Sequence, residues 1–213
     1  MNPFPPLYAL LDTDTLQRRD LDPFAVLDAW LDAGVRLVQL RAKSAPSGLV
    51  LEWAERASRL VRDAGGVFIV NDRADIALLS GADGVHVGQD DLAPRDIRRI
   101  DGGRLRIGLS THTPAQFEAG CAEPVEYLAI GPVFPTSTKD AAADPPVGLD
   151  GVRAAARRSN GLPVVAIGGI TLENAGSVIE AGAASVAVIS DLLAGDPGAR
   201  ARAFLEALGK PTI

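Results

Sequence analysis

Short apolar runs alternate with longer helical stretches along the whole chain, and this alternation limits the possible folds more than any other feature. The runs are of strand length and carry Val and Ile at neighbouring positions, as parallel strands buried on both faces do. We predict eight strands, at residues 7–11, 35–40, 67–70, 84–87, 105–109, 127–130, 164–167 and 185–189.

Helical patterns fill the intervals between the predicted strands. Thr113 and Thr171 stand where N-caps belong, and Gly34 and Gly182 stand where helices end. We predict helices at residues 23–33, 48–64, 74–80, 94–100, 114–121, 149–158, 172–181 and 197–208.

Eight strand-then-helix units in 213 residues predict a single-domain (β/α)8 TIM barrel over residues 1–213. The alternative is an open, doubly wound α/β sheet. The first helix lacks a GxGxxG opening, and eight regular units favour a closed barrel.

Composition excludes several classes of protein. Apolar residues make up 47% of the chain and its net charge is −6, which is typical of a soluble protein and unlike a non-specific nucleic-acid binder. No apolar run approaches the roughly 20 residues that span a bilayer, and residues 1–6 lack a signal-peptide pattern. A single cysteine, Cys121, permits no internal disulfide, so we expect a cytoplasmic protein. The oligomeric state stays open, and a homo-oligomer is one possibility.

The loop at residues 131–139, after the sixth predicted strand, is the most informative local segment. It ends in Thr136, Ser137, Thr138 and Lys139, so hydroxyl groups lie beside an ammonium group. Such a loop can surround an anion that has several oxygens, and a diphosphate is the natural guest.

Polar residues also end the second predicted strand. Gln39, Arg41 and Lys43 share one parity, so they point to one side if the strand continues. That side is the barrel mouth if Val38 and Leu40 face the helices. Surface salt bridges are the alternative interpretation.

Acidic residues end the third and fourth predicted strands. Asp72 and Asp91 follow neighbouring strands, so their carboxylates can approach one another. Two carboxylates without His or Cys favour Mg²⁺ over Zn²⁺. Asp90 is a further candidate ligand, and the resemblance described below prefers Asp91 to it. Alternatively, either aspartate caps a helix.

The two histidines differ in their surroundings. His86 lies within the fourth predicted strand, where we expect an interior histidine with satisfied hydrogen bonds. His112 follows the fifth strand and is a candidate acid or base. Ser110 lacks the sequence of a nucleophile elbow and any recognisable triad.

A second anion site is predicted after the last two strands. Gly168 and Gly169 follow the seventh strand, and Ile189 and Ser190 end the eighth. These two loops form the usual phosphate site of such barrels, where glycines and a helix N-terminus favour an anion. A diphosphate site and a phosphate site together suggest an enzyme that joins a diphosphate substrate to a phosphorylated partner.

Eight segments in order resemble the thiamine phosphate synthase family. They are LYALLDTD, QLRAK, FIVNDRADIA, GADGVHVGQDDL, GLSTHT, AIGPVFPTSTK, PVVAIGGI and SVAVIS, which together extend from residue 7 to residue 190. The family usually has Glu where Ala42 stands here. Ala42 has the opposite strand parity to Arg41, so we expect little catalytic consequence.

The resemblance implies a transferase that condenses an aminopyrimidine methyl diphosphate with thiazole phosphate, using Mg²⁺, to give thiamine phosphate and diphosphate. It implies that diphosphate leaves first and that the thiazole captures a pyrimidine carbocation. It assigns the metal to Asp72 and Asp91, the thiazole phosphate to Gly169, Ile189 and Ser190, and catalysis to Arg41, Lys43, Ser110 and Lys139. By the same resemblance the pyrimidine diphosphate contacts Gln39, Leu40, Arg41, Ala42, Lys43, Asn71, Ser110, Thr136, Ser137, Thr138 and Lys139.

Two other functions remain open at this point. A thiazole tautomerase or regulatory relative of the same fold would use a histidine, for which His112 is the candidate, and would need no diphosphate clamp. A non-catalytic binder of phosphate ligands is the third possibility. The full set of charged and metal-binding residues favours the synthase.

Overall fold

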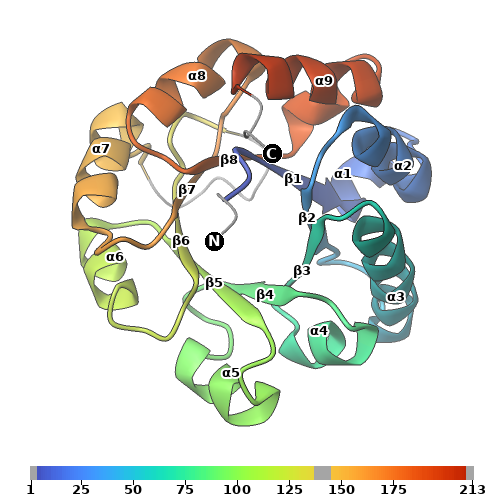
Figure 1. Cartoon of the computed structure of the whole chain (residues 1–213), viewed down its shortest axis with the longest axis horizontal. Coiled ribbons are helices and arrows are strands. Elements are labelled where there is room, and N and C mark those ends of the chain that lie inside the picture. Colours follow the sequence, from blue (N-terminus) through green and yellow to red (C-terminus); the bar gives the residue numbers. More distant parts are fainter. Residues whose placement is uncertain (1–3, 137–144, 210–213) are drawn as a thin grey trace.

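The computed structural model describes residues 4–136 and 145–209. Eight parallel strands pair in sequence order and the last pairs with the first, which closes a barrel inside a ring of helices (Figure 1). The predicted (β/α)8 barrel is therefore confirmed. The strands are β1 (Leu7–Asp12), β2 (Leu37–Arg41), β3 (Val67–Asn71), β4 (Gly84–Val87), β5 (Arg106–Thr111), β6 (Tyr127–Ile130), β7 (Val164–Ile167) and β8 (Ser185–Val188).

All eight predicted strands are present, with ends shifted by at most two residues. Two ends shift by two residues: β5 ends at Thr111 where we predicted 109, and β2 begins at Leu37 where we predicted 35. Val35 instead completes the end of the preceding helix, because its amide donates to the Trp30 carbonyl at 3.0 Å.

The eight predicted helices are also present, and proline opens four of them at a position where a missing amide costs nothing. They are α2 (Pro23–Ala33), α3 (Ser47–Asp63), α4 (Ala74–Ser80), α5 (Pro94–Asp101), α6 (Pro114–Gly120), α7 (Gly148–Arg158), α8 (Leu172–Glu180) and α9 (Pro197–Ala207). Two short helices were not predicted: α1 (Thr13–Arg18) and the 3₁₀ helix η1 (Ser190–Leu193).

Strand parity separates two apolar cores. Side chains that point outward, such as Val38 and Leu40, join Trp30 and Phe204 in the core between strands and helices. Side chains that point inward fill the barrel itself, and these include Tyr8, Leu10, Leu37, Ile69, Tyr127, Ala129, Val165, Ala187 and Ile189.

Gly108 on β5 makes room for the largest inward side chain. A Cβ atom at this position would overlap the ring of Tyr127, which lies on the neighbouring strand β6 and is 2% exposed. Glycine is thus the residue that lets a tyrosine ring lie across the inside of the barrel.

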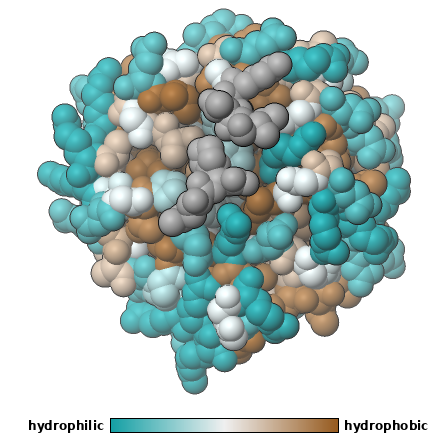
Figure 2. Space-filling model, viewed as in Figure 1, coloured by the Kyte–Doolittle hydropathy of each residue, from teal (hydrophilic) through white to brown (hydrophobic). Residues whose placement is uncertain are grey.

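The outer surface is mainly polar. Figure 2 shows hydrophilic side chains around the helical rim in the view of Figure 1, with smaller hydrophobic areas between them. Within residues 4–136 and 145–209, no helix combines the length and apolar character needed to cross a membrane.

Candidate active site

The carboxyl ends of the strands gather the predicted charged residues at one end of the barrel, which we call the mouth. Arg41 at the end of β2 forms an ion pair with Asp12 at the end of β1, and the Asp12 side chain is only 2% exposed. Asp12 also caps α1, because its carboxylate accepts from the Thr15 amide at 2.9 Å. The guanidinium of Arg41 is therefore held in place at the mouth by a buried carboxylate.

Lys43 forms an ion pair with Asp72, so the predicted cation and the predicted metal ligand meet. Burial raises the pKa of Asp72, Lys43 lowers it, and the nearby Asp91 carboxylate raises it. The net result is a pKa above the usual value for an aspartate. The expectation that Asp72 and Asp91 approach one another is met. A neighbouring carboxylate that raises the pKa of Asp72 favours a cation bound between the two.

Hydrogen bonds with backbone groups hold both aspartates in place. Asp72 has φ +62°, a left-handed conformation that is uncommon for a residue other than glycine, and its amide donates to the His86 carbonyl at 2.7 Å. Asp91 accepts from the Gly88 amide at 2.7 Å. Neither aspartate is the N-cap of a described helix, so the capping alternative does not apply.

A continuous line of hydrogen bonds crosses the barrel interior, and we call it the interior network. Gln39 Nε2 donates to the Tyr8 hydroxyl at 2.7 Å, and that hydroxyl lies 2.9 Å from the Tyr127 hydroxyl. The Tyr127 hydroxyl is 2.9 Å from His86 Nδ1, and His86 Nε2 is 2.8 Å from Ser110 Oγ. The predicted satisfied interior histidine is confirmed, and it joins Gln39 to Ser110.

The remaining predicted contacts on β2 and β3 divide by parity. The side chains of Leu40 and Ala42 pack in the outer core, so these residues can offer only backbone groups to the mouth. Asn71 pairs in register with His86 and therefore shares its inward direction at the end of β3.

The loop after β6 is only partly described. Thr136 is its last described residue, while Ser137, Thr138 and Lys139 lie outside the described residues. His112, the candidate acid or base, has Nδ1 within 2.8 Å of the Gly131 carbonyl, so this nitrogen carries a proton and donates.

The predicted phosphate loops lie side by side, because β7 and β8 pair. Gly168 and Gly169 have φ angles of +99° and +65°, which side chains would strain. The Asp191 carboxylate accepts from the Leu172 amide at 2.9 Å and so occupies the first helical amide.

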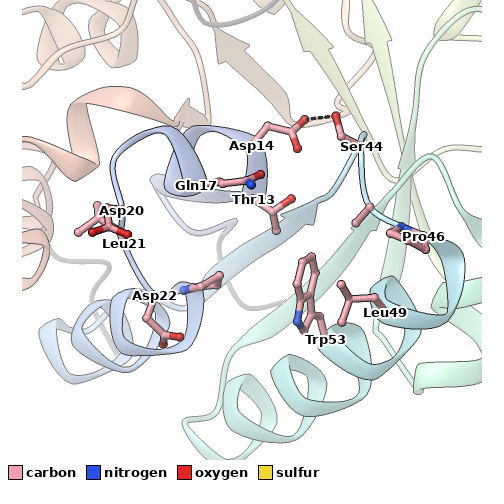
Figure 3. A pocket seen from close by; sticks show the side chains of 12 residues that line it. Thr13, Asp14, Gln17, Asp20, Leu21, Asp22, Ser44, Pro46, Leu49 and Trp53 are labelled. Carbon is pink, nitrogen blue, oxygen red and sulfur yellow. Dashed lines mark hydrogen bonds between the residues drawn. The ribbon is translucent and has the colours of Figure 1, made fainter.

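A groove of about 660 Å³ lies on the outer side of the loops that follow β1 and β2 (Figure 3). Trp53, Leu49 and Pro46 line one wall, and Asp14 at its edge accepts a hydrogen bond from Ser44 at 3.1 Å. None of the predicted site residues lines this groove, but Thr13 in its lining donates to the Arg41 carbonyl at 3.4 Å, so it adjoins the candidate active site.

A family model described as thiamine monophosphate synthase matches residues 7–192. The chain belongs to the thiamine monophosphate synthase family. It is 45% identical to the thiamine-phosphate synthase of Koribacter versatilis over 96% of both chains. It is 43% identical to the enzyme of that name from Chloroflexus aurantiacus, over 92% of this chain and 89% of the relative.

Solved structures agree with the thiamine monophosphate synthase family. Thiamine phosphate pyrophosphorylase from Pyrococcus furiosus superposes with a TM-score of 0.85 at 32% identity, over 95% of both chains. A 3-hexulose-6-phosphate synthase superposes with a TM-score of 0.68 at 17% identity, over 96% of this chain and all of the other, which shows the shared fold alone.

Sequence reasoning missed three residues that organise the site in this member of the thiamine monophosphate synthase family. Asp12 holds Arg41, and the hydroxyls of Tyr8 and Tyr127 connect Gln39 to His86. Asp12 could have been found from the segment LDTD, because an aspartate before a helix start is a typical N-cap and Asp14 is an acidic residue in the first turn of α1. For the tyrosines the sequence holds no signal, because their meeting depends on strand register.

Proposed function

We propose that the protein is a thiamine-phosphate synthase, a transferase that joins an aminopyrimidine methyl diphosphate to thiazole phosphate and releases diphosphate. The observation that carries the proposal is the mouth itself: Lys43, Asp72 and Asp91 interact there in a chain of this family, and Arg41 ends the same strand that leads to Lys43. Two cations beside a carboxylate pair suit a diphosphate that arrives with a divalent metal.

The chemistry of the donors fits Mg²⁺. Within residues 4–136 and 145–209, no cluster of three or more His, Cys, Asp or Glu side chains surrounds a common point. Mg²⁺ does not need such a cluster, since it commonly takes one or two carboxylates and completes its shell with water and phosphate oxygens. Asp72 and Asp91 would hold it, and when bound it would supply Lewis-acid stabilisation of the diphosphate.

The residues of the chain divide the remaining work. Arg41 and Lys43 bind the negative diphosphate, and the family resemblance assigns Thr136, Ser137, Thr138 and Lys139 to the same group. These groups stabilise the charge that builds up as diphosphate leaves a pyrimidine cation. The site needs no base or nucleophile for this step.

The partner substrate binds beside the first. Its phosphate lies at Gly169, Ile189 and Ser190, where left-handed glycine backbone allows close approach. Holding the thiazole there places its nitrogen next to the cation, and this proximity replaces a bimolecular encounter.

A Lys139→Ala variant tests the diphosphate assignment. We expect kcat/KM for thiamine phosphate formation to fall by about 100-fold or more, since one fixed charge donor at a transition state contributes that much. Arg157→Ala removes an exposed cation in the last turn of α7, and as the control it should keep wild-type kinetics. Full activity of Lys139→Ala would contradict the assignment of the loop.

The tautomerase alternative is not favoured, because the similar relatives named above are synthases. A direct assay separates the two: formation of thiamine phosphate from the two synthase substrates identifies the synthase. We also propose that the protein works in the cytoplasm, in keeping with its single cysteine and net charge of −6.

A further inference from the structure

The interior network connects the buried Gln39 side chain to Ser110 near the end of β5. The family resemblance assigns substrate contacts to these two ends of the network and to none of the residues between them. We propose that Tyr127 and His86 are positioning residues that fix Ser110 as a hydrogen-bond donor toward the substrate. The identity of the substrate rests on the proposed function, whereas the direction of the hydrogen bonds rests on the geometry alone.

The direction begins at Gln39. An amide Nε2 can only donate, so the Tyr8 oxygen accepts from it over 2.7 Å. Burial raises the pKa of both Tyr8 and Tyr127, so each hydroxyl keeps its proton. The proton of Tyr8 then goes to its other partner, the Tyr127 oxygen at 2.9 Å.

The next step sets the tautomer of His86. Because Tyr127 accepts from Tyr8, its own proton points to His86 Nδ1 at 2.9 Å, and Nδ1 is therefore an acceptor. A neutral imidazole carries one ring proton, which must then lie on Nε2. His86 Nε2 consequently donates to Ser110 Oγ over 2.8 Å.

The Ser110 hydroxyl can then donate its proton only away from His86. Its oxygen accepts from His86, so the hydroxyl proton points away from the histidine, and the half-buried side chain stands at the end of β5. In the proposed reaction the pyrimidine ring nitrogens and the diphosphate oxygens are all acceptors. A serine held as a donor matches either group.

The same direction excludes a different use of the His86–Ser110 pair. In a serine nucleophile triad, the third group accepts a proton from the imidazole, so the far nitrogen is free to take the serine proton. Here Tyr127 donates to the imidazole, and the far nitrogen already carries a proton. His86 therefore cannot activate Ser110 as a nucleophile.

Nitrogen NMR of the imidazoles reads the direction without any turnover. The chain contains only two histidines, so a His112→Gln variant assigns both signal sets. We expect His86 to show a protonated Nε2 and an unprotonated Nδ1. A proton on Nδ1 in the wild-type protein would overturn the proposal, even if the protein makes thiamine phosphate.

Two conservative variants separate positioning from packing. Tyr127→Phe keeps the ring that stacks on His86 at 5.5 Å but removes the donor to Nδ1. Tyr8→Phe removes a buried hydroxyl one step earlier and leaves the Tyr127 donor in place. Both leave comparable buried groups without partners, so a purely structural role predicts similar losses for the two.

The positioning role predicts different results for the two variants. In Tyr127→Phe, His86 should no longer show a single tautomer. Its kcat/KM should fall by about fivefold to tenfold, which corresponds to the free energy of one hydrogen bond. Tyr8→Phe should keep the tautomer and stay within about threefold of wild type. Equal kinetic losses with an unchanged tautomer in both variants would refute positioning. A wild-type protein that makes no thiamine phosphate would instead refute the proposed function.

Discussion

The two ends of the barrel use the same residue types in opposite ways. At the mouth, Asp72 lies beside a second carboxylate and its pKa is raised by burial and by Asp91. At the opposite end, which we call the base, Asp101 is fully buried. Burial by itself raises the pKa of Asp101, but the amides of Gly103 and Leu105 and the guanidinium of Arg98 hold it below its usual value.

The difference lies in what each carboxylate faces. Asp101 accepts from Gly103 N at 2.9 Å, Leu105 N at 3.0 Å and Arg98 Nη1 at 3.0 Å. Arg98 also donates to both carboxylate oxygens of Glu126, at 2.6 and 2.7 Å. Charges at the base are thus neutralised by the fold itself, whereas the carboxylate pair at the mouth is poised for a cation from outside.

The largest expected effect is at the mouth. Asp72→Asn should lower kcat/KM by about 100-fold or more, because metal stabilisation of a phosphate oxygen contributes several kcal/mol. The free energy of unfolding should change by less than about 1 kcal/mol, since the Lys43 partner is half exposed. Steady-state kinetics and urea unfolding measure the two quantities. Normal activity in this variant would contradict the assignment of Asp72 to metal binding, and with it the difference between mouth and base.

The base should show the reverse pattern. Asp101→Asn should reduce the free energy of unfolding by roughly 2–4 kcal/mol, because it removes the charge that two amides and Arg98 surround. Activity of the folded protein should stay near that of wild type. Asp96→Asn is the matched control on the same helix, where an exposed pair with Arg99 contributes at most about 0.5 kcal/mol. Equal stability losses in the two variants would contradict the role of Asp101.

The smallest expected effect is the pH dependence of the base. The folded pKa of Asp101 is below its unfolded value of about 3.9. Its ionised form therefore contributes stability above the unfolded pKa, and this contribution is lost as pH falls through the folded pKa. The stability difference between wild type and Asp101→Asn should therefore narrow as pH falls below about 4. Urea titrations across this range measure it, and a constant gap would contradict the assignment.

The sequence predicted the fold well because strand and helix periods are local. The eight strands and eight helices follow from apolar runs, caps and glycines. Helix α1 was missed because it begins at Thr13, directly after β1, with no glycine or proline between them. Its signal was Asp12, whose side chain caps the helix.

The sequence predicted only the part of the candidate site that follows from where the strands end. Lys43, Asp72 and Asp91 meet because the carboxyl ends of parallel strands share one edge, which the topology guarantees. The interior network was not predictable in this way. Tyr8 and Tyr127 are 119 residues apart, and their hydroxyls meet only through the diameter and register of the closed barrel.

Gly108 limits which side chains can be introduced inside the barrel below its mouth. The space that its missing side chain leaves is filled by the ring of Tyr127, whose hydroxyl lies beside His86. A larger residue at position 108 would have to be introduced together with a smaller one at position 127. Substitutions at these two positions on neighbouring strands are therefore coupled, and a change at one requires a compensating change at the other.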